Sequence, residues 1–212
     1  MTNSNPITAL TDRFRGYLPV VIDVETGGFN AKTDALLEVA AATLYMDGLG
    51  KLQINDVYQY HVEPFENANL EPSALEFTGI EPYCDSRQAE PETFVLNDLF
   101  KTLRQEIKSQ DCTKAVMVAH NAHFDLGFIN AACGRCRIKR NPFHPFSCMD
   151  TATLAGLAYG HTVLAKACEL AGIDFSSAKA HSAAYDVQKT AELFCLIVNR
   201  WQSMGGWPIA RG

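Results

Sequence analysis

The pattern of hydrophobic and polar positions changes along the chain, and the change predicts which segments are strands and which are helices. The first third carries continuous apolar runs, which are typical of buried strands. They occupy residues 18–24 (LPVVIDV), 35–46 (ALLEVAAATLYM) and 57–62 (VYQYHV). Asp47-Gly48 between the last two runs predicts a hairpin turn. Three strands with short connections predict an antiparallel meander, although the Ala and Leu content of 35–46 would also suit a helix.

Beyond residue 64 the apolar positions recur at helical spacing, with one further buried strand among them. A short helix is expected from Pro72, because proline is favoured in a first turn. The other expected elements are helices at 94–107, 124–132, 154–157, 164–170 and 183–201, and a strand at 115–119. A meander followed by alternating strands and helices predicts an α/β layered domain in which helices flank a mixed central sheet. We expect a single domain over residues 1–212, with a short flexible N-terminus of about ten residues.

Composition narrows the class of protein. The chain has 212 residues, with 18 basic and 24 acidic side chains and a net charge of −6. This balance argues against a nucleic-acid binder that relies on overall positive charge, but it allows one with a local basic patch. Seven scattered cysteines are typical of reduced, intracellular thiols. No apolar run reaches the roughly 20 residues that cross a bilayer, and the first residues lack a signal-peptide layout. We therefore expect a soluble cytoplasmic protein with no membrane partner.

Two carboxylates, Asp23 and Glu25, interrupt the end of the first apolar strand. Side chains two positions apart on a strand point to the same face. Neighbouring carboxylates repel each other and are costly to bury, so a bound cation is the natural compensation. An isolated Asp-x-Glu more often marks the exposed start of a turn, and this pair alone does not decide between the two interpretations.

Two further motifs stand where a strand or loop passes into a helix. Asn-x-x-Phe-Asp at 121–125 follows the strand at 115–119, and His-x-x-x-x-Asp at 181–186 opens the last long helix. Functional groups gather at strand ends in α/β proteins, but the helix dipole also favours an Asp in a first turn. Residues five apart on a helix diverge by about 140°. His181 and Asp186 therefore converge only if His181 precedes the helix, a boundary that the capping candidate Ser182 supports.

In this order the motifs resemble the DEDD exonuclease superfamily in its histidine-containing branch, which has a ribonuclease H-like fold. Each motif falls on the element that this branch uses: the first strand, a strand-to-helix junction and the opening of a late helix. Longer segments narrow the resemblance to the ribonuclease T family over nearly the whole chain. They are VVIDVETGGFNAKTDALLEVAA, HVEPF, VMVAHNAHFD, KRNPFHPF, AHSAAYD and LFCLIVNRWQSMGGWP.

The resemblance implies a two-metal phosphodiester hydrolase that removes nucleotides from a 3′ end. Its catalytic residues would be the metal ligands Asp23, Glu25, Asp125 and Asp186 together with His181, as general base or water-orienting group. Hard oxygen ligands favour two Mg²⁺ ions, for which Mn²⁺ could substitute. The implied substrates are the 3′ ends of tRNA, of ribosomal RNA precursors and of other structured RNAs. Single-stranded DNA would also be degraded, and the products would be nucleoside 5′-monophosphates.

Four phenylalanines hold positions beside these motifs: Phe29, Phe77, Phe124 and Phe146. Core packing is the usual role of phenylalanine, and the residues alone leave packing and base stacking equally open. In the family that the chain resembles, such side chains sandwich the 3′-terminal bases. Ser73 departs from that family, which carries an acidic residue near the bases. This departure puts the family's discrimination among terminal bases, such as its reluctance at cytosine, in doubt here.

Basic residues form a second set, consisting of Arg13, Arg15, Lys108, Lys114 and Lys139. A run of charges is usually a solvated face. These positions, however, match a patch of the ribonuclease T family, in which the patch of one subunit serves the active site of the other. The resemblance therefore implies a homodimer, with substrate binding that weakens steeply with salt.

Several other functions compete with this one. Cys133 and Cys136 allow a thiol redox protein, although that chemistry needs the pair at a helix N-terminus and here it follows a helix. A structural zinc site that adds His144 and Cys148 is also open. A non-catalytic RNA-binding module is a weaker alternative, because all five positions that are catalytic in the family carry the expected residue here. Within the enzyme class, the alternative is a DNA-directed 3′–5′ exonuclease of repair or proofreading, because stacking does not distinguish ribose from deoxyribose.

Overall fold

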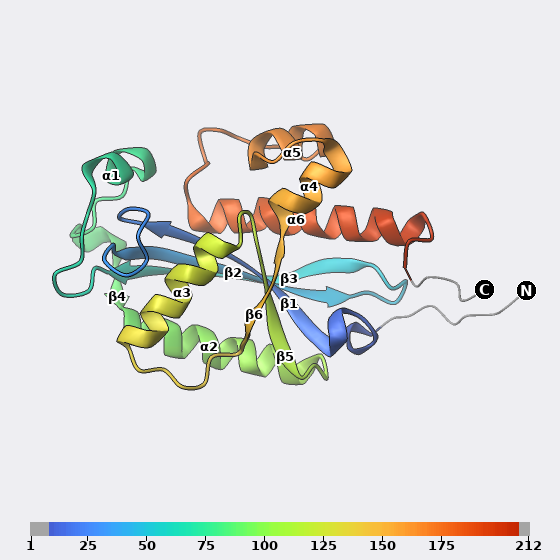
Figure 1. Ribbon diagram of the computed structural model, residues 1–212, viewed down its shortest axis with the longest axis horizontal. Coiled ribbons are helices and arrows are strands. Elements are labelled where there is room, and N and C mark those ends of the chain that lie inside the picture. The colour runs from blue at the N-terminus through green and yellow to red at the C-terminus, as the bar shows by residue number, and fades with distance from the viewer. Residues whose placement is uncertain (1–8, 208–212) are drawn as a thin grey trace, which may run out of the picture.

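A six-stranded mixed sheet forms the centre of the protein in the computed structural model, which describes residues 9–207 (Figure 1). Its order is β4-β3-β2-β1-β5-β6. The strands are β1 (Tyr17–Thr26), β2 (Leu36–Met46), β3 (Leu52–Glu63), β4 (Glu90–Pro91), β5 (Lys114–Ala119) and β6 (Phe143–Asp150). β2 pairs antiparallel with β1 and with β3, whereas β5 is parallel to β1, so the predicted meander and mixed sheet are confirmed. The N-terminal segment predicted to be flexible lies almost entirely outside the described residues.

β1 is the central strand, because it pairs with β2 on one side and β5 on the other. Its residues from Leu18 to Ile22 are all buried, and the strand pairs with β5 up to Val21. The run at 35–46 is a strand rather than a helix, because it pairs with β1 along one edge and with β3 along the other. β3 begins five residues earlier than expected: Asn55 and Asp56 disfavour a strand locally, but pairing with β2 outweighs this preference.

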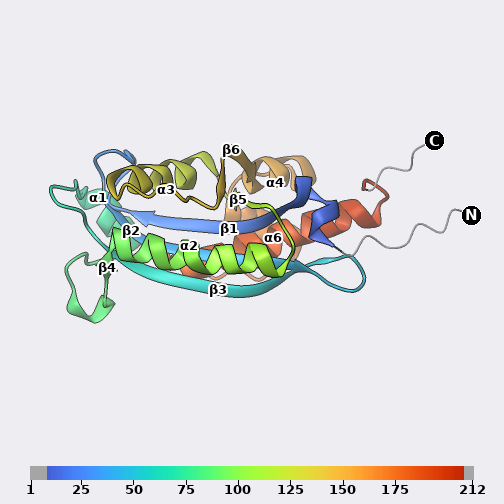
Figure 2. The ribbon, with the colours of Figure 1, turned by 90° about the horizontal axis from the view of Figure 1, so that it is seen from below.

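Helices cover both faces of the sheet, with α2 on one face and α6 on the other (Figures 1 and 2). The helices are α1 (Pro72–Thr78), α2 (Glu92–Ser109), α3 (His123–Arg135), α4 (Thr151–Tyr159), α5 (Leu164–Ala171) and α6 (Ala183–Ser203), with single 3₁₀ turns at Leu10–Asp12, Phe14–Gly16 and Asp85–Arg87. α1 begins at the expected proline and ends at Gly79, whose φ of 69° a residue with a side chain rarely adopts. α6 packs against β1, β2 and β3, and so closes the face that carries the acidic motifs.

β6 was not predicted, because Pro142 and Pro145 argue against a strand in this segment. The strand is tolerated at the edge of the sheet, where only β5 pairs with it. The register jumps from Phe143 opposite Ala115 to Cys148 opposite Met117, so residues 144–147 bulge out of the ladder. His144 holds the bulge, because its Nδ1 accepts the N–H of Ser147 at 2.9 Å and that of Phe146 at 3.4 Å. The bulge leaves Phe146 79% exposed.

A buried ion pair joins the first residue of α2 to the last residue of α3. Two nitrogens of Arg135 donate to the carboxylate of Glu92, at 2.6 and 3.1 Å, and a third donates to the carbonyl of Ala31 at 2.9 Å. The guanidinium also lies 4.1 Å from the ring of Phe65. Arg135 therefore contributes to packing and does not offer its charge to a ligand. Among the helices described, none is both long enough and apolar enough to cross a membrane.

Candidate active site

Two of the acidic residues come from the C-terminal half of β1. Asp23 lies opposite Ala40 of β2 and Glu25 lies opposite Glu38. Being two residues apart, they point to the same face of the sheet, the one covered by α6. Glu25 is buried and Asp23 is half-buried. The alternative, an exposed pair at the start of a turn, does not describe these side chains.

The third acidic residue comes from the first turn of α6. Asp186 accepts a hydrogen bond at Oδ2 from the backbone N–H of His181, at 2.9 Å. His181 precedes the helix with a φ of 68°, and Ser182 occupies the N-cap position. The prediction that His181 lies before the helix and Asp186 within it is therefore confirmed. The side chain of Ser182 makes no capping hydrogen bond, so its position is right and the bond expected of it is not formed.

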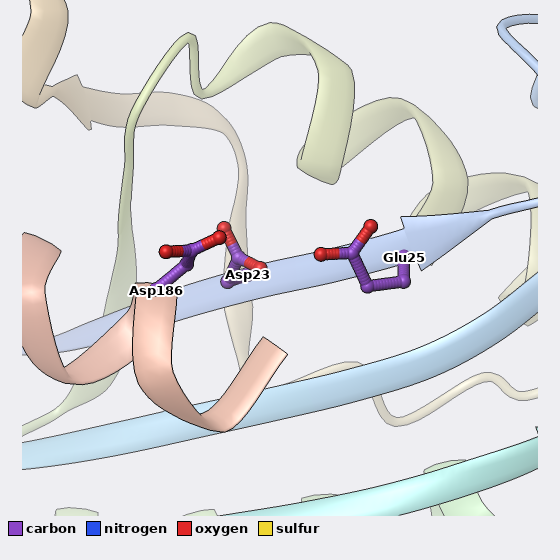
Figure 3. A group of neighbouring side chains, drawn as sticks. All are labelled: Asp23, Glu25 and Asp186. Carbon is purple, nitrogen blue, oxygen red and sulfur yellow. The ribbon is translucent and has the colours of Figure 1, made fainter. Parts of the chain in front are cut away.

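Asp23, Glu25 and Asp186 form one cluster, in which a carboxylate oxygen of each lies within 4.8 Å of the others (Figure 3). Asp125, in the first turn of α3, is buried beside this cluster but is not a member of the close group. Its Oδ1 accepts the backbone N–H of Val24 at 3.1 Å, which fixes it against β1 between the two other acids of that strand. The structure thus brings three of the four predicted ligands together and places the fourth next to them.

Burial raises the pKa of all four carboxyl groups, and repulsion from neighbouring carboxylates of the cluster adds to it for Asp23 and Glu25. Burial, reinforced by the charges of Asp186, Glu38 and Asp125, raises the pKa of Glu25 to about 8. Burial also raises the pKa of Asp125 to about 8, and it raises that of Asp186. The pKa of Asp23 lies well above its ordinary value because of burial and then of the charges of Asp125 and Glu25. So many carboxylates are stable as anions at one place only beside a compensating positive charge.

The donor set fits a divalent cation. All four groups are hard oxygen ligands, which suit Mg²⁺, Mn²⁺ or Ca²⁺ better than zinc. Within residues 9–207, the Oδ1 of Asp186 is buried and has no hydrogen-bond partner. A cation bound between Asp186 and the two acids of β1 would satisfy that oxygen. The same group is the only gathering of three or more potential ligands among the described residues, so Cys133, Cys136, His144 and Cys148 form no zinc site there.

A hollow of about 390 Å³ opens beside the cluster, and its lining is largely apolar with three phenylalanines. Its lining includes Glu25, Phe29, Ser73, Phe77 and Phe124. Phe29 is 80% exposed and Phe77 is 65% exposed, so neither contributes to the core. Phe77 lies against His181, with the ring centroids 4.0 Å apart. Three of the four selected phenylalanines therefore surround one space; Phe146, on the β6 bulge, is not part of its lining.

The basic residues do not lie at this site. Arg15 is exposed above the ring of Tyr17, and Tyr17 pairs with Lys114 at the start of β1 and β5. Glu25 is eight residues further along β1, a distance of roughly 26 Å in a strand. Lys108 and Lys139 are also exposed. Arg13 is only 6% exposed: it bonds Gln202 at 3.2 Å and lies 4.2 Å from the ring of Trp207, and burial lowers its pKa to about 10.

The two neighbouring cysteines have the wrong environment for redox chemistry. Cys133 lies in the last turn of α3 and Cys136 caps its C-terminus. Burial raises the pKa of Cys133 to about 12 and also raises the pKa of Cys136. Reactive thiols need the opposite shift, which a helix N-terminus provides. The geometry therefore disfavours the thiol redox alternative.

Sequence reasoning missed two acids that support the cluster. Asp150, at the end of β6, accepts the N–H of Asn121 and that of Ala152, both at 2.9 Å, and so fixes the turn before α3. Glu38 is buried opposite Glu25. A signal for Glu38 was present, because it is the only charged residue in the apolar run at 35–46.

The site has the layout of a DEDD-type exonuclease. This layout consists of Asp-x-Glu on a strand, a second Asp at a strand-to-helix junction and a His-Asp pair at the start of a helix. Residues 20–194 match the exonuclease family RNase_T. The chain is 59% identical to ribonuclease T of Vibrio cholerae over 210 residues, covering 99% of this chain and 94% of that protein. It is equally similar to ribonuclease T of Vibrio parahaemolyticus, with 98% of that protein covered.

Solved structures share the fold at lower identity. The nuclease domain of 3′hExo, a DEDDh family member bound to rAMP, superposes with a TM-score of 0.69 at 21% identity, over 89% of this chain and 92% of that one. Escherichia coli Exonuclease I, in complex with a dT13 oligonucleotide, has a TM-score of 0.68 at 19% identity over 90% of this chain; the match spans 43% of that longer chain. The chain belongs to the RNase_T exonuclease family. It is a 3′–5′ exonuclease, a phosphodiester hydrolase that uses divalent metal.

The raised carboxyl pKa values predict how stability depends on pH when no metal is bound. In the unfolded chain these groups titrate near pH ~4, whereas Glu25 and Asp125 titrate at about 8 when folded. Between these values the folded state holds more protons than the unfolded state, so the free energy of unfolding falls as pH rises through the window. We expect the melting temperature in EDTA to decrease from about pH 5 to about pH 8, as measured by circular dichroism.

Millimolar Mg²⁺ should reverse this decrease, and its stabilising effect should be larger at the higher pH, because the metal binds the ionised carboxylates. The variant Glu25→Gln removes one titrating group and should show a shallower decrease in EDTA. A melting temperature that stays level or rises across the window in the metal-free protein would contradict the electrostatic account of the site.

Proposed function

We propose that the protein is a 3′–5′ exoribonuclease that trims the 3′ ends of tRNA, of ribosomal RNA precursors and of other structured RNAs, and that it also degrades single-stranded DNA. The products are nucleoside 5′-monophosphates. The observation that carries the proposal is the position of an acidic cluster beside a hollow lined by exposed phenylalanines. The ribonuclease T relatives support RNA as the substrate. The domain spans residues 1–212 and acts in the cytoplasm.

The four carboxylates would hold two Mg²⁺ ions, for which Mn²⁺ could substitute. Asp23, Glu25 and Asp186 are close enough to share one ion, and Asp125 adds a ligand from the α3 side. When bound, the metals supply a polarised water and stabilise the leaving 3′ oxygen. His181 would act as the general base that accepts a proton from the attacking water. Phe77 holds the histidine ring from one side.

The phenylalanine hollow selects a free 3′ end. Phe29 and Phe77 present exposed faces on which terminal bases stack, each contact contributing about 1–3 kcal/mol. Phe124 packs against Phe128 behind them and supports the ring of Phe29. Phe146 reaches the substrate from the β6 bulge. Ser73 lines the same space with a neutral hydroxyl, so discrimination among terminal bases differs from that of family members with an acid there.

The active form is a homodimer. The roughly 26 Å between the start of β1 and Glu25 separates Arg15 and Lys114 from the carboxylates of their own subunit. Arg15, Lys108, Lys114 and Lys139 bind the RNA backbone at the site of the partner subunit. Arg13 acts indirectly: its buried guanidinium holds the turn that presents Arg15.

A DNA-directed 3′–5′ exonuclease of repair or proofreading is the second candidate, supported by the shared fold with Exonuclease I. Stacking surfaces and metal ligands serve both sugars. A time course on 3′-extended tRNA, single-stranded DNA and blunt duplex DNA, each with Mg²⁺, separates the two candidates. We expect trimming of the tRNA to stop near its duplex stem, slower degradation of single-stranded DNA and no attack on the blunt duplex. Preference for the duplex would favour the repair enzyme.

Asp186→Asn should abolish hydrolysis while the fold is retained. The substitution removes a charge from a cluster in which the carboxylates already repel, so it does not destabilise the metal-free protein. It removes one ligand of the metal site, and we expect a decrease in kcat of roughly 10³-fold or more. Mononucleotide release from 3′-extended tRNA measures the effect, with circular dichroism as the control for folding. More than a trace of activity in a clean preparation would rule out the assigned role.

Phe29→Ala and Phe77→Ala should weaken substrate binding in distinguishable ways. Loss of one stacking surface raises KM by roughly 5- to 150-fold for a single-stranded substrate. Phe77→Ala should also lower kcat, because its ring packs against His181. Phe94→Ala is the matched control, since Phe94 is an exposed phenylalanine on α2 and should leave both constants unchanged. Equal effects of all three substitutions would show that the hollow does not bind bases.

Complementation tests the dimer directly. Asp186→Asn has an intact patch and an inactive site, whereas the double variant Lys108→Ala/Lys139→Ala has the reverse. If each patch serves the partner's site, re-equilibrated equimolar mixtures should recover activity toward about a quarter of the parent level. The double variant alone should show a salt dependence of binding that is shallower by about two in slope. A monomer in sedimentation analysis with full activity, or no recovery on mixing, would contradict the arrangement.

A further inference from the structure

A row of three polar side chains crosses the sheet behind the metal cluster. Glu25 on β1 lies directly opposite Glu38 on β2, and Glu38 lies directly opposite His61 on β3. Residues opposite each other on adjacent strands point to the same face. All three therefore face α6, and Glu38 is the middle member.

Both carboxylate oxygens of Glu38 have a partner. Oε1 lies 2.9 Å from Nδ1 of His61. Oε2 accepts the backbone N–H of Ala183, the first residue of α6, at 3.4 Å. That N–H is one of the four at a helix start that have no partner within the helix. Glu38 thus ties the middle of the sheet to the point where α6 begins, one turn before Asp186.

The charge of Glu38 acts on the cluster as well. It contributes to the raised pKa of Glu25 and of Asp23. A buried negative charge behind the ligands makes the metal-free cluster less favourable and attracts a cation more strongly. Glu38 is thus placed both to orient the ligands and to increase their affinity for metal.

We propose that Glu38, held by His61, is a positioning residue of the metal site: it fixes the start of α6, and with it Asp186, relative to Glu25, and raises the affinity for divalent cations. The inference rests on the proposed metal site and adds a fifth carboxylate to it that does not itself bind the metal. A purely structural role would change the stability of the protein but not its affinity for metal.

The test is a calorimetric titration of the metal-free full-length protein with Mn²⁺, without nucleic acid. We expect Glu38→Gln to weaken Mn²⁺ binding by about tenfold or more, the scale for loss of a group that orients a ligand. The matched control is Glu63→Gln, which removes one exposed charge from β3, on the strand of His61, and should leave the affinity unchanged. His61→Leu keeps Glu38 but removes its partner, and it should weaken binding in the same direction.

The outcomes separate the inference from the proposed function. Unchanged Mn²⁺ affinity in Glu38→Gln, or in His61→Leu should Glu38→Gln fail to fold, overturns the inference and leaves the nuclease assignment intact. A parent protein that binds Mn²⁺ with the expected dependence on Glu38, but releases no mononucleotide from RNA or single-stranded DNA, overturns the proposed function alone. A parent that binds no Mn²⁺ overturns both.

Discussion

Repulsion among the carboxylates at the end of β1 determines how the surrounding strands and helices must be arranged. A folded domain normally keeps such groups apart or in water. Here the central strand supplies two of them, and α3 and α6 each bring another from a different direction. Only a rigid frame can hold like charges this close together, and the frame consists of a strand paired on both sides and helices that start where the strand ends. With all four carboxyl groups ionised, this arrangement is stable only when a metal ion is bound.

The fold was predictable wherever one local signal dominated. The apolar runs of β1 and β2 and the long stripe of α6 identified their elements, because burial on one or both faces leaves a periodic trace. The sequence of β6 carries no such periodic pattern. Its prolines argue against a strand, and its pairing with β5 depends on tertiary contacts. The sequence also did not predict the first residues of β3 as a strand. Asn55 and Asp56 disfavour a strand locally and adopt one because they lie beside β2.

The site shows the same division. The order of the motifs along the chain predicted all five proposed catalytic residues, and the structure places each of them at an element boundary or strand end that the sequence marks. The sequence did not reveal the role of Glu38, because that role depends on Glu25 and His61, which lie opposite it on the two neighbouring strands. The register between strands cannot be read from the sequence of one strand alone. Arg13 and Arg15 cannot be told apart from the sequence, because both are basic residues two positions apart. The fold buries Arg13 against Trp207 and leaves Arg15 exposed beside Tyr17.

The pleat of β1 sets the separation between Asp23 and Glu25, and no loop contributes to it. Two residues of extended chain span roughly 6–7 Å, and that distance is held by pairing with β2 on one side and by the hydrogen bond from Val24 to Asp125 on the other. Ser73 and Phe77, by contrast, stand on α1, a single short helix that makes few contacts with the sheet. These two residues of the hollow therefore stand on a different element from the strand that supplies Asp23 and Glu25, and the contact of Phe77 with His181 links the two. A change at Ser73 therefore alters the lining of the hollow and leaves the spacing of Asp23 and Glu25 on β1 as it is.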